Sequence, residues 1–158
     1  VEARIHGLLT RRLNDEPLGY IVGNQSFWGL EFEVNRDVLI PRPCSETLIE
    51  ASTEILKTTL DKESSDISVL DIGTGSGCLL ISFCCEAEHL GYKTKNGTYL
   101  GVDVSARALN VAKTNAARLD VANLCDFVLG DFKEKYFGLC NISRQSILPA
   151  NGFDFVFC

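Results

Sequence analysis

An apolar run that ends in three alternating glycines is the feature that most constrains the fold of this chain. The run covers residues 67–72, the glycines lie within 73–77, and a helical pattern of apolar residues follows over 76–90. Glycine lets the backbone turn sharply and approach a ligand closely, because it has no Cβ. The next helix directs unpaired N–H groups and the positive end of its dipole toward the turn. The segment therefore predicts a strand, a ligand-binding turn and a helix in succession.

Strand and helix patterns alternate through the remainder of the chain. Further apolar strands are expected at 99–104, 126–129 and 153–157, and a helix at 105–119 carries its apolar residues on one face. Repeated strand–helix units predict an α/β fold with a parallel sheet and helices on both faces. Ligands of such sheets bind beyond the carboxyl ends of the strands, where the glycine segment lies.

The N-terminal part of the chain has a different organisation. Apolar spacing predicts a helix over residues 2–13. Two extended runs at 20–22 and 27–34, joined by a turn at 23–26, predict a β-hairpin.

A proline-rich loop joins this hairpin to the strand–helix units. Residues 38–43 read Val-Leu-Ile-Pro-Arg-Pro, and each proline fixes its own φ and keeps the preceding residue extended. Ser45 is expected to cap the next helix. The predicted apolar face of that helix comprises Leu48, Ile49, Ser52, Ile55, Leu56 and Leu60.

These patterns divide the chain into three predicted parts. Residues 1–19 would end an N-terminal helical domain, 20–43 would form the hairpin and linker, and 44–158 would form the ligand-binding domain. A polar, charged stretch at 61–66 is expected to be a linker. Because the chain contains no methionine, we expect that residue 1 is not the natural start.

Composition indicates a compact intracellular domain without a membrane anchor. The 158 residues are 46% hydrophobic, yet no run approaches the ~18 apolar residues of a membrane helix. The net charge of −6 argues against long nucleic acid as a direct partner, because phosphates would be repelled. No signal or transit peptide is visible.

The cysteines predict neither a metal site nor disulfides. Seven cysteines form no Cys-x-x-Cys pair, and His6 and His89 are too isolated to complete a zinc site. Most of the cysteines lie in apolar stretches, so we expect buried, reduced thiols.

Acidic residues follow two of the predicted strands. Asp103 could accept hydrogen bonds from both hydroxyls of a ribose, and Asp131 from the exocyclic amino group of a base. Phe132 could lie against a flat base. The alternatives are a solvated strand-end aspartate and an ordinary Gly-Asp turn. Asp71, at the end of a buried strand, is expected to order the amides of the glycine turn rather than to touch ligand.

The glycine segment with its preceding acid resembles the S-adenosylmethionine loop of class I methyltransferases. The spacing is G-x-G-x-G rather than the G-x-G-x-x-G of nicotinamide-binding folds, and the alternative is a turn that only joins strand to helix. The cofactor implied by this resemblance is S-adenosyl-L-methionine, held in a Rossmann-like fold. The residues implied at its methionine end are Gly73, Thr74, Gly75, Ser76 and Gly77.

Three N-terminal segments narrow the resemblance. Residues 16–23 (Glu-Pro-Leu-Gly-Tyr-Ile-Val-Gly), 27–32 (Phe-Trp-Gly-Leu-Glu-Phe) and 38–43, followed by Glu46, resemble the HemK/PrmC family. Members of this family are N5-glutamine methyltransferases that act on peptide-chain release factors. The resemblance extends from about Arg11 to the end of the chain.

The resemblance implies a role for each matching residue. Asp103 would bind the ribose, and Asp131 with Phe132 the adenine. Leu39, Pro41 and Arg42 would form a wall beside the methyl donor, or alternatively a hinge that only packs the hairpin on the sheet.

The sequence departs from the family pattern in two places. Cys44-Ser45 stands where the family has an acidic residue and threonine, and the family's Asn-Pro-Pro-Tyr motif is expected just beyond Cys158. That motif would hold the target amide, whose delocalised lone pair must be aligned with the S–CH₃ bond. We therefore expect no catalytic residue within these 158 positions, and a cofactor-binding fragment that is inactive by itself.

Other functions remain open at this stage. They are an adenine-N6 methyltransferase of DNA or RNA, a ribosomal-protein glutamine methyltransferase, and a non-catalytic S-adenosylmethionine-binding protein. The expected protein substrate is a peptide-chain release factor, and the expected compartment is the cytoplasm or the mitochondrion. Neither a metal nor a membrane is expected to take part.

Overall fold

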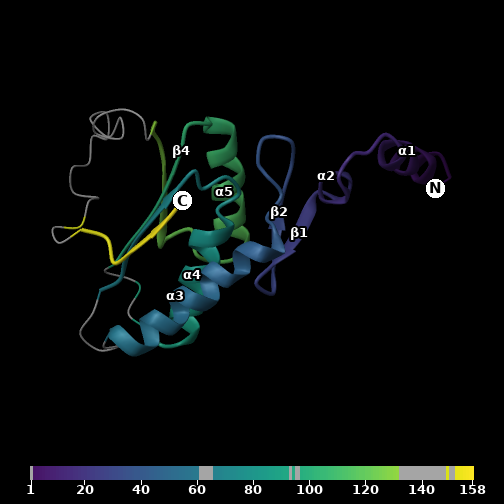
Figure 1. Cartoon of the computed structure of the whole chain (residues 1–158). Helices are drawn as coiled ribbons and strands as arrows, with labels where there is room; N and C mark the ends of the chain where they lie inside the picture. Colours follow the sequence, from purple (N-terminus) through teal and green to yellow (C-terminus); the bar gives the residue numbers. More distant parts are fainter. Residues whose placement is uncertain (1, 61–65, 93, 95–96, 132–148, 150–151) are drawn as a thin grey trace.

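A computed structural model gives the arrangement of the chain (Figure 1). It describes residues 2–60, 66–92, 94, 97–131, 149 and 152–158. The predicted linker at 61–66 therefore lies outside the described residues except for Asp66. The predicted domain boundaries after residues 19 and 43 stay predictions.

A parallel four-stranded sheet forms the centre of the fold. Its strands are β3 (Ser68–Ile72), β4 (Thr98–Asp103), β5 (Cys125–Leu129) and β6 (Phe155–Phe157), in the order β5-β4-β3-β6. Each pair of neighbours runs parallel, which confirms the predicted α/β class. Because β3 lies between β4 and β6, the glycine segment that follows it opens at the middle of the carboxyl edge.

Three helices contribute to one core on the sheet (Figure 1). These helices are α3 (Glu46–Thr59), α4 (Cys78–His89) and α5 (Ala106–Arg118). Their buried side chains pack with those of one sheet face in a cluster that includes Ile49, Leu56, Val69, Leu80, Phe83, Tyr99, Leu109 and Ala112. A separate cluster on the strands, built on Leu70, Leu100 and Val102, contains no residue from these helices. Helices on both faces were expected, and within the described residues α3, α4 and α5 share one face.

The N-terminal hairpin differs from its prediction. Residues Leu18–Val22 form a short helix, α2, and Gly23 ends it with a left-handed φ of 84°. The two strands are β1 (Asn24–Phe27) and β2 (Leu30–Glu33), paired antiparallel. The prediction of a strand at 20–22 and a turn at 23–26 was therefore wrong.

The turn of this hairpin consists of Trp28 and Gly29, with φ of 51° and 71°. Positive φ at both central residues matches the right-handed twist of paired strands. A tryptophan in that conformation is uncommon, so this turn could not be predicted from the residue types.

The first helix, α1 (Glu2–Leu13), forms as predicted but has no buried residue. It lies at the end of the molecule away from the sheet (Figure 1). Arg11 of α1 forms an ion pair with Glu16, at 2.6 Å, and Glu16 also pairs with Arg36. The hydrogen bond from Arg11 is the main reason why the pKa of Glu16 falls to about 2.

Helix α3 begins directly after Ser45, as predicted, but the Ser45 side chain does not cap it. Ser45 ends a 3₁₀ turn, η1 (Pro43–Ser45), and its side chain caps no backbone N–H. Ile49, Ser52 and Leu56 are buried as predicted, together with Thr53. The predicted inward positions Leu48 and Ile55 are exposed, because only one narrow face of α3 meets α4.

The cysteines are less buried than expected. Cys84 and Cys125 are buried, while Cys44 and Cys158 are exposed. All cysteines in the described part of the chain are free thiols. Burial raises the pKa of Cys78 and of Cys85 to about 11, so both remain protonated at neutral pH.

Candidate functional site

The glycine loop is held in shape by backbone hydrogen bonds to the next strand. The amides of Gly73 and Thr74 both donate to the carbonyl oxygen of Val102, over 2.8 and 3.0 Å, and Gly77 donates to Thr74 over 2.8 Å. Gly73, Gly75 and Gly77 have φ of 75°, 55° and 79°. These values lie in the region that side chains disfavour, which explains glycine at alternate positions.

Gly77 is required for a second reason. A Cβ at this position would lie 2.8 Å from Cδ1 of Ile81 and 3.3 Å from Cβ of Ala112. The missing side chain lets α4 begin directly against α5. The loop therefore keeps a close contact between two helices while Gly73 stays exposed and Gly75 partly exposed.

A cleft of about 170 Å³ opens between the glycine loop and the proline-rich loop. It brings together residues that lie more than thirty positions apart in the sequence, including the whole predicted wall of Leu39, Pro41 and Arg42. The proline-rich loop is fixed from behind, because the hydroxyl of Tyr20 donates to the carbonyl oxygen of Val38 over 2.7 Å. The lining residues are Leu39, Ile40, Pro41, Arg42, Ser45, Asp71, Gly73, Thr74, Gly75, Ser76, Cys78 and Leu79.

Asp103 lies next to this cleft, at the end of β4. Its carboxylate accepts hydrogen bonds from the amides of Gly75 and Ser105, both over 2.9 Å. The side chain thereby joins the glycine loop to the start of α5, where Ser105 caps the helix through Ala108. Asp103 is half-buried, and each carboxylate oxygen retains capacity for a further hydrogen bond.

Comparison with known proteins identifies the fold family. A family model described as a methyltransferase domain matches residues 63–158, which include the glycine loop and Asp103. The chain belongs to this methyltransferase-domain family.

Relatives of known name are more specific than the family model. The methyltransferase chain is 43% identical over 125 residues to the release factor glutamine methyltransferase of Nitratidesulfovibrio vulgaris, covering 79% of the chain and 38% of the relative. The release factor glutamine methyltransferase of Pasteurella multocida is 40% identical over 112 residues, covering 69% and 38%. These relatives confirm the predicted family resemblance. The chain spans about two-fifths of the length of either relative.

A solved structure supports the fold. The METTL16 methyltransferase domain superposes with a TM-score of 0.56 at 26% identity, over 82% of this chain and 46% of that one. The predicted class I methyltransferase fold is thereby confirmed.

In this methyltransferase domain, Asp71 has a different hydrogen-bond partner from the one predicted. Its carboxylate accepts a hydrogen bond from the side-chain hydroxyl of Thr74 over 2.7 Å, whereas the amide of Gly75 bonds to Asp103. Asp71 is 2% exposed yet contributes to the cleft. Burial raises the pKa of Asp71 to about 6, although the Thr74 hydroxyl opposes this shift. The expectation that Asp71 orders loop amides thus applies better to Asp103.

The third predicted strand end is described only in part. Asp131 is exposed two residues beyond β5, and Gly130 donates to the backbone oxygen of Asp103 over 3.0 Å. The ends of β4 and β5 are therefore adjacent, although Asp131 is not among the residues that line the cleft. Phe132 lies outside the described residues.

Sequence reasoning missed Asn115, a fully buried residue on α5. Its side-chain NH₂ donates to the backbone oxygens of Ser76 and Glu33, and its oxygen accepts from the amide of Glu33. The side chain thus connects the glycine loop to β2. A polar residue within the apolar stripe of a helix was the available signal, because such a residue needs buried partners.

Two features are absent from the described part of the chain. In this part of the chain, no helix is both long and apolar enough to cross a membrane. Among the same residues, no group of three or more histidine, cysteine, aspartate or glutamate side chains is placed to hold a metal ion.

Proposed function

We propose that this methyltransferase domain binds S-adenosylmethionine. We further propose that the protein to which it belongs transfers the methyl group to a glutamine amide of a peptide-chain release factor. The observation that carries the proposal is the cleft in which the glycine loop faces Leu39, Pro41 and Arg42. A glycine loop that resembles that of class I methyltransferases and a proline-rich loop that resembles that of the HemK/PrmC family line one cavity. Relatives at 40–43% identity that carry this name support the same reaction.

The residues of the cleft suit the proposed cofactor. Gly73 is exposed and a Cβ there would meet nothing within 4 Å, so ligand atoms can approach the backbone closely. In this proposal residues 73–77 bind the methionine end, and Asp103 accepts hydrogen bonds from the ribose. Asp131 and Phe132 would hold the adenine. When bound, the cofactor supplies a methyl group on a positively charged sulfonium.

The proposed reaction depends on positioning more than on acid–base groups. An amide nitrogen is a weak nucleophile because its lone pair is delocalised, so the protein must fix its direction of attack. Leu39 and Pro41 would exclude water from one side of the cleft. The Asn-Pro-Pro-Tyr motif of the family would hold the amide. Because the sulfonium provides the driving force, the reaction needs no metal.

A methyl-transfer assay tests the substrate. The protein that carries this chain is incubated with tritiated S-adenosylmethionine and a release factor containing Gly-Gly-Gln. We expect label on this factor and none on the same factor with its glutamine changed to alanine. Equal labelling of both factors would exclude the glutamine as target. Labelling of DNA adenine with none on the release factor would favour the adenine-N6 reaction instead.

The proposal also bears on partners and compartment. A net charge of −6 disfavours direct nucleic-acid binding by this chain. A release factor as substrate implies a compartment with translation, which is the cytoplasm or the mitochondrion.

A further inference from the structure

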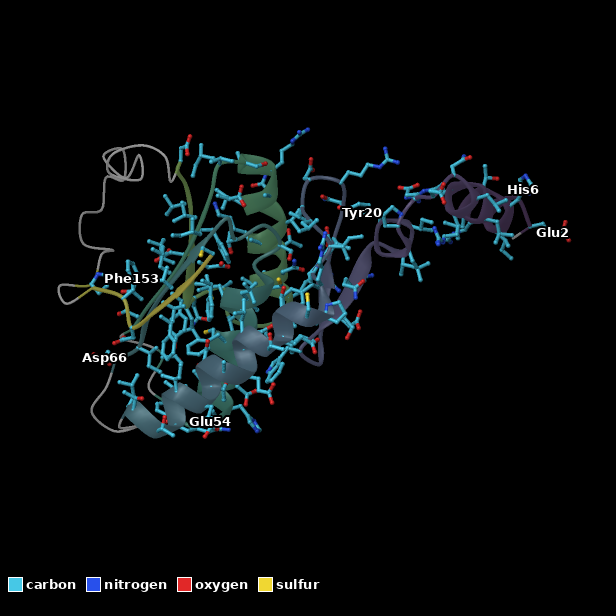
Figure 2. All side chains as sticks on the ribbon, in the orientation of Figure 1. Glu2, His6, Tyr20, Glu54, Asp66 and Phe153 are labelled. Carbon is cyan, nitrogen blue, oxygen red and sulfur yellow. The ribbon has the colours of Figure 1, made fainter. Side chains whose placement is uncertain are left out.

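A second groove lies away from the cofactor cleft, between α3, α4 and the turn of the hairpin. Its volume is about 490 Å³, larger than that of the cleft. The residues that matter for its chemistry are Trp28, Glu50, Thr53, Glu54, Lys57 and Glu86. Glu54, labelled in Figure 2, lies on α3, and none of the residues that line the groove also lines the cofactor cleft.

One wall of the groove is the indole ring of Trp28, a residue held by one backbone and one ring hydrogen bond. The amide of Trp28 donates to Oε1 of Glu46 over 2.7 Å. The ring nitrogen of Trp28 donates to Oε2 of Glu86 over 3.2 Å. The ring therefore has a defined orientation before any partner binds, and little side-chain entropy is lost on binding.

The groove carries an excess of negative charge. Glu50, Glu54 and Glu86 line it against the single positive charge of Lys57, three acids minus one base. Among the described residues, neither Glu50 nor Glu54 forms an ion pair. Both carboxylates are exposed on α3 and available to a cation from outside.

A buried hydroxyl adds an independent observation. Thr53 lines the groove between Glu50 and Glu54, and the residue is 4% exposed. Its hydroxyl has no hydrogen-bond partner among the described residues. A buried polar group without a partner costs free energy, and a donor entering the groove would relieve that cost.

We propose that this groove binds an arginine side chain from a basic segment of a partner protein. A guanidinium is planar and can stack on the indole of Trp28. Its N–H groups form a rigid fork that suits carboxylates and a hydroxyl oxygen, whereas a lysine ammonium is a strongly hydrated point charge. The site is separate from the cleft, so it is a docking surface and not part of the proposed chemistry.

Fluorescence provides a direct test, because Trp28 is the only tryptophan of the chain. A blocked Gly-Arg-Gly peptide is titrated into the protein, and a peptide with neutral citrulline in place of arginine serves as the matched ligand. We expect a saturable change in Trp28 emission with the arginine peptide. Binding of the citrulline peptide should be weaker by about tenfold, because the charge-assisted hydrogen bonds are lost.

Variants of the exposed charged residues test whether the peptide binds in the groove. Glu50→Gln and Glu54→Gln should each weaken arginine binding about threefold, the loss typical of a partly exposed ion pair. Lys57→Gln should strengthen it. Glu2→Gln on α1 is the control: it changes the net charge as Glu50→Gln and Glu54→Gln do, but outside the groove. It should leave the affinity for the peptide unaltered.

Either of two results would overturn the proposal. One is equal affinity for the arginine and citrulline peptides. The other is an affinity that does not respond to Glu50→Gln and Glu54→Gln, or responds equally to Glu2→Gln. No cofactor and no methyl transfer enter the measurement, so the result is independent of the proposed function.

Discussion

The side-chain amide of Asn115 on α5 donates a hydrogen bond over 2.9 Å to the backbone oxygen of Ser76 in the glycine loop. The same amide group donates to Glu33 of the hairpin, 82 positions away in the sequence. A single side chain therefore fixes the separation between the hairpin and the loop proposed to bind the cofactor. The hairpin leads into the proline-rich loop, so this bond also bears on the shape of the cleft.

We predict that Asn115→Ala lowers the free energy of unfolding by about 2–4 kcal/mol, because buried backbone groups of Ser76 and Glu33 lose their partners. Urea denaturation measures the loss. Asn110→Ala on the same helix is the matched control, since Asn110 is exposed. An equal stability of the two variants would contradict a structural role for the Asn115 amide.

Asp103→Ala should weaken binding of S-adenosylhomocysteine by about 1.5–3 kcal/mol, the range for a hydrogen bond to a charged group. The variant loses the proposed ribose acceptor and also the bond to the amide of Gly75. Calorimetry gives the affinity. Asp126→Ala, at an exposed position of β5, should bind normally. An unchanged affinity in Asp103→Ala would remove this residue from the proposed site.

Asp71 should make the stability of the protein depend on pH. Its folded-state pKa of about 6 lies above the ordinary value of 3.8, so the folded protein retains a proton that the unfolded chain releases between these values. Stability conferred by this proton is present at low pH and is lost as the pH rises toward 6, by about 3 kcal/mol in total.

The variant Asp71→Asn tests this dependence, because an amide cannot ionise but can still accept the hydrogen bond from Thr74. We expect the variant to exceed the parent in stability at about pH 8 and to show little difference at about pH 4. Urea titrations at both values give the comparison. If the stability of the parent protein rose from about pH 4 to about pH 8, and the stability of the variant rose equally, Asp71 would ionise normally.

Gly77→Ala should destabilise the protein by about 1–3 kcal/mol, since the new Cβ adds a contact of 2.8 Å with Ile81 to a strained φ of 79°. Thermal unfolding measures the effect. Gly7→Ala is the control, because a Cβ at Gly7 in α1 meets nothing within 4 Å and alanine favours a helix. A neutral Gly77→Ala would mean that α4 and α5 can separate without cost.

Local pattern predicted much of the sheet domain. The four strands and the helices α4 and α5 begin and end within two residues of their predicted bounds. The strands β3 and β4 are buried over almost their whole length, which matches their unbroken apolar runs, and α5 buries residues at helical spacing. The hairpin was harder to predict, because its register depends on a tryptophan at positive φ, which Glu46 and Glu86 hold in place from α3 and α4.

The sequence by itself determined the glycine loop, because alternate positive φ values at residues 73, 75 and 77 exclude most side chains regardless of surroundings. It also determined that Asp103 ends the strand beside this loop, since strand length and the parallel arrangement set that position. Only the tertiary structure decided what Asp71, Asp103 and Asn115 contact. Those contacts join segments dozens of positions apart, and their geometry follows from how helices and hairpin pack rather than from any local preference of the chain.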